Sequence, residues 1–305
     1  MKILFLGTAA AEGIPGLFCR CPVCLNAREK GGREIRTRSG AMIDGKLKLD
    51  FGPDSFWHLQ RYGLDYLDMR SVLITHSHAD HLNPAELECR FPGYCYTQDG
   101  TAPENPLTIY GNEAVGRTVE PYTRHPSGSL AFRKMTPFEP VQVEDYTVTA
   151  LEAVHCCDPD GTGYPVRFRG RTVYRTEDAL IYLIEKDGQS ILYAHDTDEF
   201  SEANMEYLAG RQISLISLDC TSGRIPSRDI HWIGHMTSED CLRLREKLIA
   251  TGAAGERTRF VANHFSHNGY SDYEDMERIT PGFIISYDGL VIDLSDGKGA
   301  AVGTR

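Results

Sequence analysis

The sequence lacks any apolar run close to the roughly 20 residues that a membrane-spanning helix needs. The apolar stretch that precedes Gly7 is also too short for the hydrophobic region of a secretion signal, and it is typical of a first core strand. We therefore expect no membrane partner and a cytoplasmic location.

Positive charge is also scarce. The chain has 32 lysines and arginines against 43 aspartates and glutamates, which gives a net charge of −11. A protein that wraps nucleic acid without sequence preference needs an excess of basic residues to replace the counterions, so nucleic acid is not an expected partner. A small anionic substrate is not excluded, because it responds only to the local field.

Repeats, low-complexity tracts and Pro/Ser-rich linkers are missing as well, so we expect a single domain over residues 1–305. Apolar residues make up 41% of the chain, enough for a substantial core. We find no flavin-binding module, which argues against a redox enzyme with two irons. The nine cysteines are unevenly spaced, and in a reducing compartment clustered cysteines more often bind metal than form disulfides.

Alternating apolar patterns and turn signals predict strands connected by hairpins, with helices between them. Asp-Gly pairs at 44–45, 187–188 and 288–289 each predict a hairpin turn. Helices are predicted over 54–62, 84–90, 200–209, 238–251 and 272–279. The predicted strands lie within 2–7, 41–52, 71–75, 107–111, 146–155, 179–196, 213–220, 259–265 and 282–294. These elements favour two sheets packed face to face with helices outside, and 89–106 and 156–178 look like insertions.

The most informative segment is THSHADHL, residues 75–82, which follows the predicted strand at 71–75. It places His76, His78, Asp80 and His81 within six residues. On an extended turn His76 and His78 point the same way and can reach one metal ion, while Asp80 and His81 point toward a second ion about 3.5–4 Å away. Imidazole and carboxylate ligands suit zinc or manganese, with iron as a third option.

The pattern H-x-H-x-D-H after a strand resembles the signature of the metallo-β-lactamase superfamily, and the resemblance extends over essentially the whole chain. It implies an αββα sandwich and three further metal ligands at later strand ends: a histidine, a bridging aspartate and a final histidine. His155, Asp196 and His264 match these in order. The resemblance assigns His76, His78 and His155 to one metal; it assigns Asp80, His81 and His264 to the other, with Asp196 between them.

A second cluster lies near the N-terminus. FCRCPVC supplies Cys19, Cys21 and Cys24, and three thiolates this close together suit a tetrahedral zinc that needs a fourth ligand. No histidine or cysteine lies between Cys24 and His58, but His267 follows His264 by three residues and can turn toward the thiolates. The alternative is three buried or reactive thiols without metal.

Within the superfamily, the cysteine cluster together with the motifs GTAAAEGIP, RTRSG, LDC, NHFSH and GFIISYDGLVI resembles one branch. That branch is the phosphodiesterase of the carbon–phosphorus lyase pathway, which acts on phosphoribosyl cyclic phosphate. The pyrroloquinoline-quinone biosynthesis branch shares a similar cysteine cluster, but its metal motif is typically less complete. The intact ligand set here favours the phosphodiesterase branch.

The leaving group and the substrate anion need further residues. In the family a histidine just before a helix contacts substrate or acts as general acid. GHMTSED aligns best with that position, which favours His235 over His231. Guanidinium groups suit phosphate, so the 156–178 segment is a candidate anion site, although it also reads as a solvated hairpin. Its arginines are Arg167, Arg169, Arg171 and Arg175.

We therefore predict a metal-dependent hydrolase with two divalent ions in the active site and one structural zinc. Its substrate is a small anion, a phosphodiester and in particular a cyclic one, and Asp80, Asp196 and His235 are the catalytic residues. The alternatives are a lactone or thioester hydrolase, a tRNA-processing nuclease, and a non-catalytic protein like that of pyrroloquinoline-quinone biosynthesis. The sequence leaves the metal and the oligomeric state open, a homodimer included.

Overall fold

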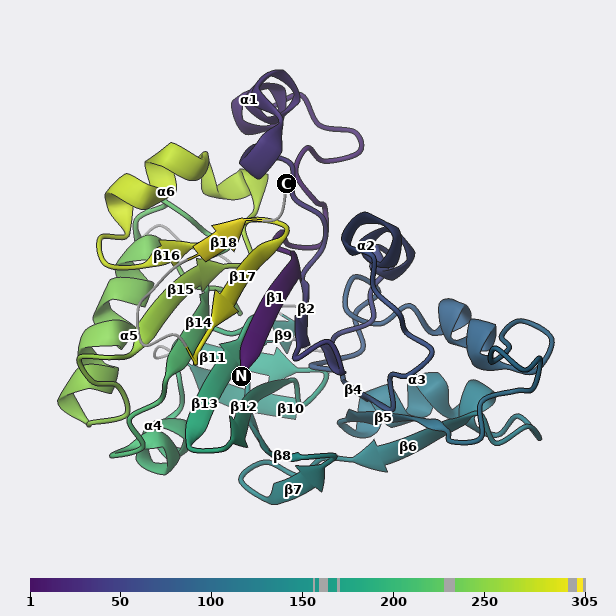
Figure 1. Cartoon of the computed structure of the whole chain (residues 1–305). Coiled ribbons are helices and arrows are strands. Elements are labelled where there is room, and N and C mark those ends of the chain that lie inside the picture. The colour runs from purple at the N-terminus through teal and green to yellow at the C-terminus, as the bar shows by residue number, and fades with distance from the viewer. Residues whose placement is uncertain (156, 159–163, 169–170, 228–233, 296–300, 304–305) are drawn as a thin grey trace.

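A computed structural model gives the fold, and it describes residues 1–155, 157–158, 164–168, 171–227, 234–295 and 301–303. Two large sheets form its centre (Figure 1). The eight-stranded sheet has the order β18-β17-β1-β2-β3-β4-β5-β6, and the seven-stranded sheet has the order β16-β15-β14-β13-β12-β8-β7.

The strands of the eight-stranded sheet are β1 (Lys2–Gly7), β2 (Gly40–Ile43), β3 (Leu47–Leu49), β4 (Ser71–Leu73), β5 (Leu107–Gly111), β6 (Leu130–Lys134), β17 (Leu290–Asp293) and β18 (Ala301–Gly303). Those of the other sheet are β7 (Pro140–Val143), β8 (Tyr146–Glu152), β12 (Leu180–Lys186), β13 (Gln189–Ala194), β14 (Leu215–Asp219), β15 (Arg259–Asn263) and β16 (Ile284–Ile285). The α-helices are α1 (Pro22–Lys30), α2 (Ser55–Tyr62), α3 (Glu113–Thr123), α4 (Glu202–Leu208), α5 (Ser238–Ala250) and α6 (Tyr273–Ile279).

Alternate residues of each strand enter different apolar layers, which explains the layering. In β12, Tyr182 packs between the sheets, whereas its neighbour Leu183 packs in the layer that contains Leu244 of α5. In β1, Phe5 likewise packs between the sheets, whereas Leu6 packs in the layer that contains Val115 of α3. Three apolar layers therefore separate helix, sheet, sheet and helix, and the predicted αββα sandwich is confirmed.

The Asp-Gly turns at 44–45 and 187–188 do form hairpins, β2–β3 and β12–β13. The predicted hairpin at 288–289 is wrong. β16 pairs with β15 in one sheet, whereas β17 pairs with β1 in the other, so this turn carries the chain between sheets. Asp288 fits this crossing because its carboxylate accepts hydrogen bonds from Thr37 and Thr8 of the N-terminal segment.

Several local predictions also differ from the structure. Residues 84–90 form a 3-10 helix, Pro84–Arg90, where an α-helix was predicted. The predictions omitted α1, which begins with Pro22, and α3, which contains Gly116 and Pro121. Gly116 is required there because a Cβ atom would lie 2.5 Å from the ring of Phe132.

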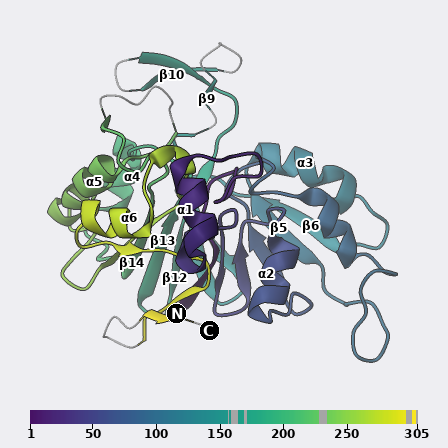
Figure 2. The same ribbon diagram turned by 90° about the horizontal axis from the view of Figure 1, so that it is seen from above.

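The 156–178 segment contributes β9 (Cys157–Asp158), β10 (Tyr164–Phe168) and β11 (Arg171–Arg175), a three-stranded sheet that projects from the body of the molecule (Figure 2). No helix in the described part of the chain is long and apolar enough to cross a bilayer. The single-domain boundary stays a prediction.

Candidate active site

The polar residues of the predicted site follow strands whose carboxyl ends meet at one edge of the two sheets. β13, β14 and β15 run parallel, so Asp196, Asp219 and His264, which end or follow them, reach the same edge. β8 runs antiparallel to β12, which runs antiparallel to β13, so His155 after β8 also lies at that edge. THSHADHL follows β4 of the facing sheet.

The structure brings all seven active-site ligand candidates together, six of them in two groups of three and Asp196 between the groups. Within each group, the ligand atoms all lie within 4.8 Å of one another. The first group is His76, His78 and His155, and the second is Asp80, His81 and His264.

Asp196 lies between the two groups. Its Oδ2 atom is 2.6 Å from His81 Nε2 and 2.9 Å from His264 Nε2. Its Oδ1 atom is 3.5 Å from His155 Nε2. A carboxylate with one oxygen toward each group has the placement that a bridging ligand requires.

The buried ligand atoms fit a cation better than they fit one another. His76 Nε2, His81 Nε2, His264 Nε2 and Asp196 Oδ2 are all buried, and none has a hydrogen-bond partner of good geometry among the described residues. Leaving four such atoms unsatisfied is costly, and metal ions that accept their lone pairs remove that cost. The residues present therefore fit two divalent ions.

Groups behind the ligands set the direction of the imidazole rings. Asp50 Oδ2 accepts a hydrogen bond from His81 Nδ1 at 2.8 Å, and Thr221 Oγ1 lies 2.7 Å from His264 Nδ1. Because each Nδ1 is occupied, each Nε2 is the nitrogen left for a metal. Asp196 and His264 have φ angles of 51° and 61°, a left-handed conformation that costs non-glycine residues energy and is frequent at functional sites.

Asp219, which the sequence reasoning quoted only as part of LDC, organises the side of the site that carries His235. Its Oδ2 atom is 3.0 Å from His235 Nδ1 and also accepts the backbone N–H of Asp196 at 3.0 Å. Its Oδ1 atom accepts the N–H groups of Thr221 and Met236. The sequence signals for Asp219 were the motif LDC and an acidic residue at the end of a predicted apolar strand.

His235 and Asp219 shift each other's pKa. Burial would lower the pKa of His235, but the Asp219 carboxylate raises it above its usual value. Burial would raise the pKa of Asp219, but His235 holds it well below its usual range. The His235 side chain keeps 19% of its surface exposed, and Nε2 has no hydrogen-bond partner among the described residues. His231, the alternative candidate, lies outside the described residues.

A model of the β-lactamase superfamily domain matches residues 50–265, which contain all seven active-site candidates. The chain belongs to the β-lactamase superfamily. This is the superfamily of metal-dependent hydrolases that the first histidine motif resembles.

Among curated proteins, the chain is 27% identical over 169 residues to an octanoyltransferase of Porphyromonas gingivalis; this covers 51% of the chain and 31% of that protein. It is 35% identical over 127 residues to coenzyme PQQ synthesis protein B of Methylobacterium radiotolerans, which covers 38% of each. The chain thus matches only about a third of the length of these curated relatives.

Three solved superfamily structures share the fold. A diphosphatase from the PhnP family matches with a TM-score of 0.67 and 21% identity, covering 96% of this chain and 97% of that one. Zinc-bound PqqB from Methylobacterium extorquens matches with a TM-score of 0.70 and 19% identity, covering 96% of this chain and 100% of that one. The short form of human tRNase Z matches with a TM-score of 0.61 and 16% identity, covering 96% of this chain and 99% of that one.

The candidate site opens into a cavity of about 370 Å³. In the described part of the chain, no lysine or arginine lines it. Arg175 is not among the lining residues, and its guanidinium donates to the backbone oxygen of Ala153. Arg169 lies outside the described residues, and the side chains of Arg167 and Arg171 are not described. The lining residues are Ala10, Ala11, Glu12, His78, Asp80, His155, Asp196, Thr221, His235, His264, Ser266 and Asn268.

The structure also brings together the four residues of the predicted zinc site. The sulfur atoms of Cys19 and Cys21 both lie 3.5 Å from His267 Nδ1, and Cys24 completes the group. A tetrahedral zinc with ordinary bond lengths places its sulfur and nitrogen ligands about 3.5 Å apart, so the spacing fits. Burial raises the pKa of the Cys24 thiol to about 12, so a nearby cation is needed to hold it as thiolate.

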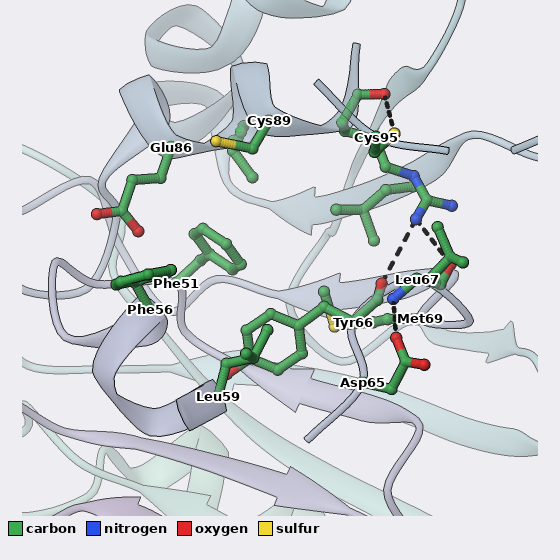
Figure 3. Close-up of a pocket in the computed structure, with 13 residues that line it drawn as sticks. Phe51, Phe56, Leu59, Asp65, Tyr66, Leu67, Met69, Glu86, Cys89 and Cys95 are labelled. Carbon is green, nitrogen blue, oxygen red and sulfur yellow. Dashed lines mark hydrogen bonds between the residues drawn. The ribbon is translucent and has the colours of Figure 1, made fainter. Parts of the chain in front are cut away.

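A second cavity of about 460 Å³ has a different character (Figure 3). It lies below the 3-10 helix Pro84–Arg90, and its walls are the rings of Phe51, Phe56 and Tyr66 with several aliphatic side chains. Glu86 and Asp65 lie at its edges. Among the described residues, no histidine lines it, and it contains none of the residue groups that could hold a metal ion. The active-site ligand candidates therefore lie at the smaller cavity.

Proposed function

We propose that this protein is a metal-dependent phosphodiesterase that hydrolyses a small, preferably cyclic, phosphodiester. The observation that carries the proposal is the complete ligand set beside a histidine held by a buried carboxylate, all facing one cavity. A phosphodiester needs both charge neutralisation at phosphorus and a proton for the leaving oxygen.

His76, His78 and His155 would hold one ion, Asp80, His81 and His264 the other, and Asp196 would bridge. Two divalent ions bound there, zinc or manganese, would supply Lewis acidity and lower the pKa of an attacking water. A third zinc would be held by Cys19, Cys21, Cys24 and His267.

The protein side chains supply position and protons. Asp80, whose carboxylate lines the cavity, would accept a hydrogen bond from the attacking water and orient it, with Asp196 beside it. His235 lines the cavity, and with Nδ1 donating to Asp219 it would carry a second proton on Nε2 and give it to the leaving alkoxide. Asp219 would hold the ring in place and stabilise its charged form.

The relatives leave rival functions open. The diphosphatase and the tRNase support phosphorus chemistry, whereas PQQ synthesis protein B represents a cofactor-biosynthesis alternative. The octanoyltransferase relative makes acyl compounds worth testing, since the same groups could open a lactone or a thioester. A substrate on the scale of tRNA is disfavoured by the net charge of −11.

The deciding experiment measures hydrolysis of bis(p-nitrophenyl) phosphate by metal-quantified wild type and Asp196→Ala, with p-nitrophenyl acetate and an acyl thioester in parallel. Turnover of the phosphodiester by wild type but not by the variant, with about three metals per wild-type chain, supports the proposal. A fully metallated wild type that is inert toward the phosphodiester but active on the acyl esters contradicts it.

A further inference from the structure

The cavity has one acidic wall that the proposed chemistry does not use. Glu12 lies in the loop after β1 and lines the cavity together with Ser266, in the loop after β15, and Asn268, in the short 3-10 helix His267–Gly269. Its side chain keeps 29% of its surface exposed. It belongs to neither group of active-site ligand candidates.

Only one oxygen of this carboxylate is occupied. Glu12 Oε1 accepts a close hydrogen bond from the Ser266 hydroxyl and lies 3.5 Å from His267 Nε2. Glu12 Oε2 has no hydrogen-bond partner within the described ranges. The nearby Asn268 side chain is exposed, and its amide is likewise without a partner in the part of the chain that the structure describes. The wall therefore presents acceptors and donors that are available to a ligand.

The loop that carries Glu12 is held firmly on both sides. The Ala10 N–H donates to the backbone oxygen of Phe265 at 2.9 Å, and Arg38 Nε donates to the backbone oxygen of Ala11 at 3.0 Å. Arg38 itself is paired with Asp54 at 3.1 Å. A fixed backbone means that Glu12 is placed before a ligand arrives, which lowers the entropy cost of binding.

Charge decides which ligand this wall accepts. The cavity lining contains the carboxylates of Glu12, Asp80 and Asp196 and, among the described residues, no lysine or arginine; positive charge here would come from His235 and from ions at the candidate metal centre, on the side of Asp80 and Asp196. Asp80 and Asp196 belong to the candidate metal groups, whereas Glu12 belongs to none of them and is left to contact whatever binds beside the reacting phosphorus. A hydroxyl group can donate to a carboxylate in a strong charge-assisted hydrogen bond, whereas a second phosphate is repelled by it.

We propose that Glu12 is a specificity-determining residue: it selects a phosphodiester whose non-reacting arm carries free hydroxyl groups, as in a sugar or polyol, and rejects one whose arm carries a second phosphate. This inference rests on the proposed phosphodiesterase function and names the substrate class for that site. Glu12 acts on the arm of the substrate and takes no part in the displacement at phosphorus.

Three substrates with the same leaving group test it. They are p-nitrophenyl phosphodiesters whose other arm is propyl, 2,3-dihydroxypropyl or 3-phosphopropyl. Values of kcat and KM are measured for wild type, Glu12→Gln and the control Glu113→Gln, a surface carboxylate on α3 paired with Lys134. Metal content is measured for every sample, because Glu12 also lies near His267.

We expect wild type to prefer the dihydroxypropyl ester over the propyl ester by about tenfold or more in kcat/KM, mainly through KM, as a hydrogen bond to a charged group allows. In Glu12→Gln this preference shrinks several-fold and the phosphopropyl ester improves, while the propyl ester and the metal content stay unchanged. Glu113→Gln should match wild type.

Equal dihydroxypropyl-to-propyl ratios in wild type and Glu12→Gln would overturn the inference while leaving the phosphodiesterase proposal intact. If the metallated wild type cleaves none of the three esters, the phosphodiesterase proposal fails. Calorimetric titration with glycerol 3-phosphate and propyl phosphate then asks about Glu12 alone. Equal affinity of wild type for both would overturn the inference, and a preference for the glycerol compound that Glu12→Gln loses would support it.

Discussion

The two clusters of candidate metal ligands in this chain differ in how they are built. The cluster at the strand ends draws its ligands from four separate segments and opens into a cavity of about 370 Å³. The thiolate cluster draws three of its four ligands from residues 19–24, and none of the four lines that cavity. Open sites with carboxylates and histidines are typical of catalysis, whereas closed four-ligand sulfur sites are typical of structure.

The comparison is informative because the two clusters share a short loop. His264 belongs to one and His267 to the other. Glu12 touches the same loop through Ser266. A metal at the thiolate cluster would therefore fix the wall of the catalytic cavity without taking part in the reaction, and each prediction below separates these two roles.

The largest effect is expected for Asp196→Ala. Removal of the bridging carboxylate should lower kcat by at least about a thousandfold, because both ions lose a ligand and the attacking water its position. Metal analysis should show one metal per chain retained at the thiolate cluster. Loss of that metal as well, or unchanged turnover, would contradict the division between the clusters.

His235→Gln should have a large effect that depends on the leaving group. A general acid contributes roughly a hundredfold to ten-thousandfold, and mainly when the leaving oxygen is basic. We therefore expect a severe loss of kcat for an alkyl phosphodiester and a small loss for bis(p-nitrophenyl) phosphate. Asp219→Asn should follow the same pattern more weakly; equal losses with both leaving groups would assign His235 to binding instead.

Cys24→Ser should act mainly on stability. The variant should lose one metal per chain and be destabilised by a few kcal/mol, on the order expected for a structural metal that binds only the folded state. The fall in kcat should stay below about tenfold, since no catalytic ligand is removed. A thermal melt and metal analysis measure both; unchanged metal content would favour free thiols at this position.

The smallest effect is expected from the order in which a chelator removes metal from the two sites. Brief exposure to EDTA should remove the metals of the open site first, so activity should fall before the melting temperature does. Re-addition of zinc or manganese should restore activity at that stage. If the metal of the thiolate cluster is released before activity is lost, the assignment of the open site to catalysis and of the closed site to structure is contradicted.

Much of the fold follows from local patterns, because strands with alternating burial and Asp-Gly turns leave clear signals. Prediction from local patterns fails where contacts between distant parts of the chain override the local preference. Gly116 and Pro121 argue against a helix, yet α3 forms because Asn112 caps it and Gly116 packs against Phe132. The turn at 288–289 resembles a hairpin, but the sheet to which each flanking strand belongs is decided by residues far away in the chain.

The candidate site was predictable to the extent that its ligands sit in short motifs at strand ends. THSHADHL is local, and the later residues could be placed only through the resemblance to the superfamily. Asp219 and Glu12 lie within the quoted motifs LDC and GTAAAEGIP, but those motifs assigned them no role: what marks them is the atoms they contact in the folded chain, namely His235 and Ser266. Their roles, like those of the ligands, remain predictions.

The wide separation of Cys24 and His267 along the chain has a consequence for biosynthesis. A ribosome releases the three cysteines early, but the fourth ligand emerges only after most of the chain has been made. Strand β1 can pair with β2 early, but its second partner, β17, is synthesised only near the end. The thiolate cluster therefore cannot gain its fourth ligand during early translation, and its three cysteines must stay reduced until His267 has been made.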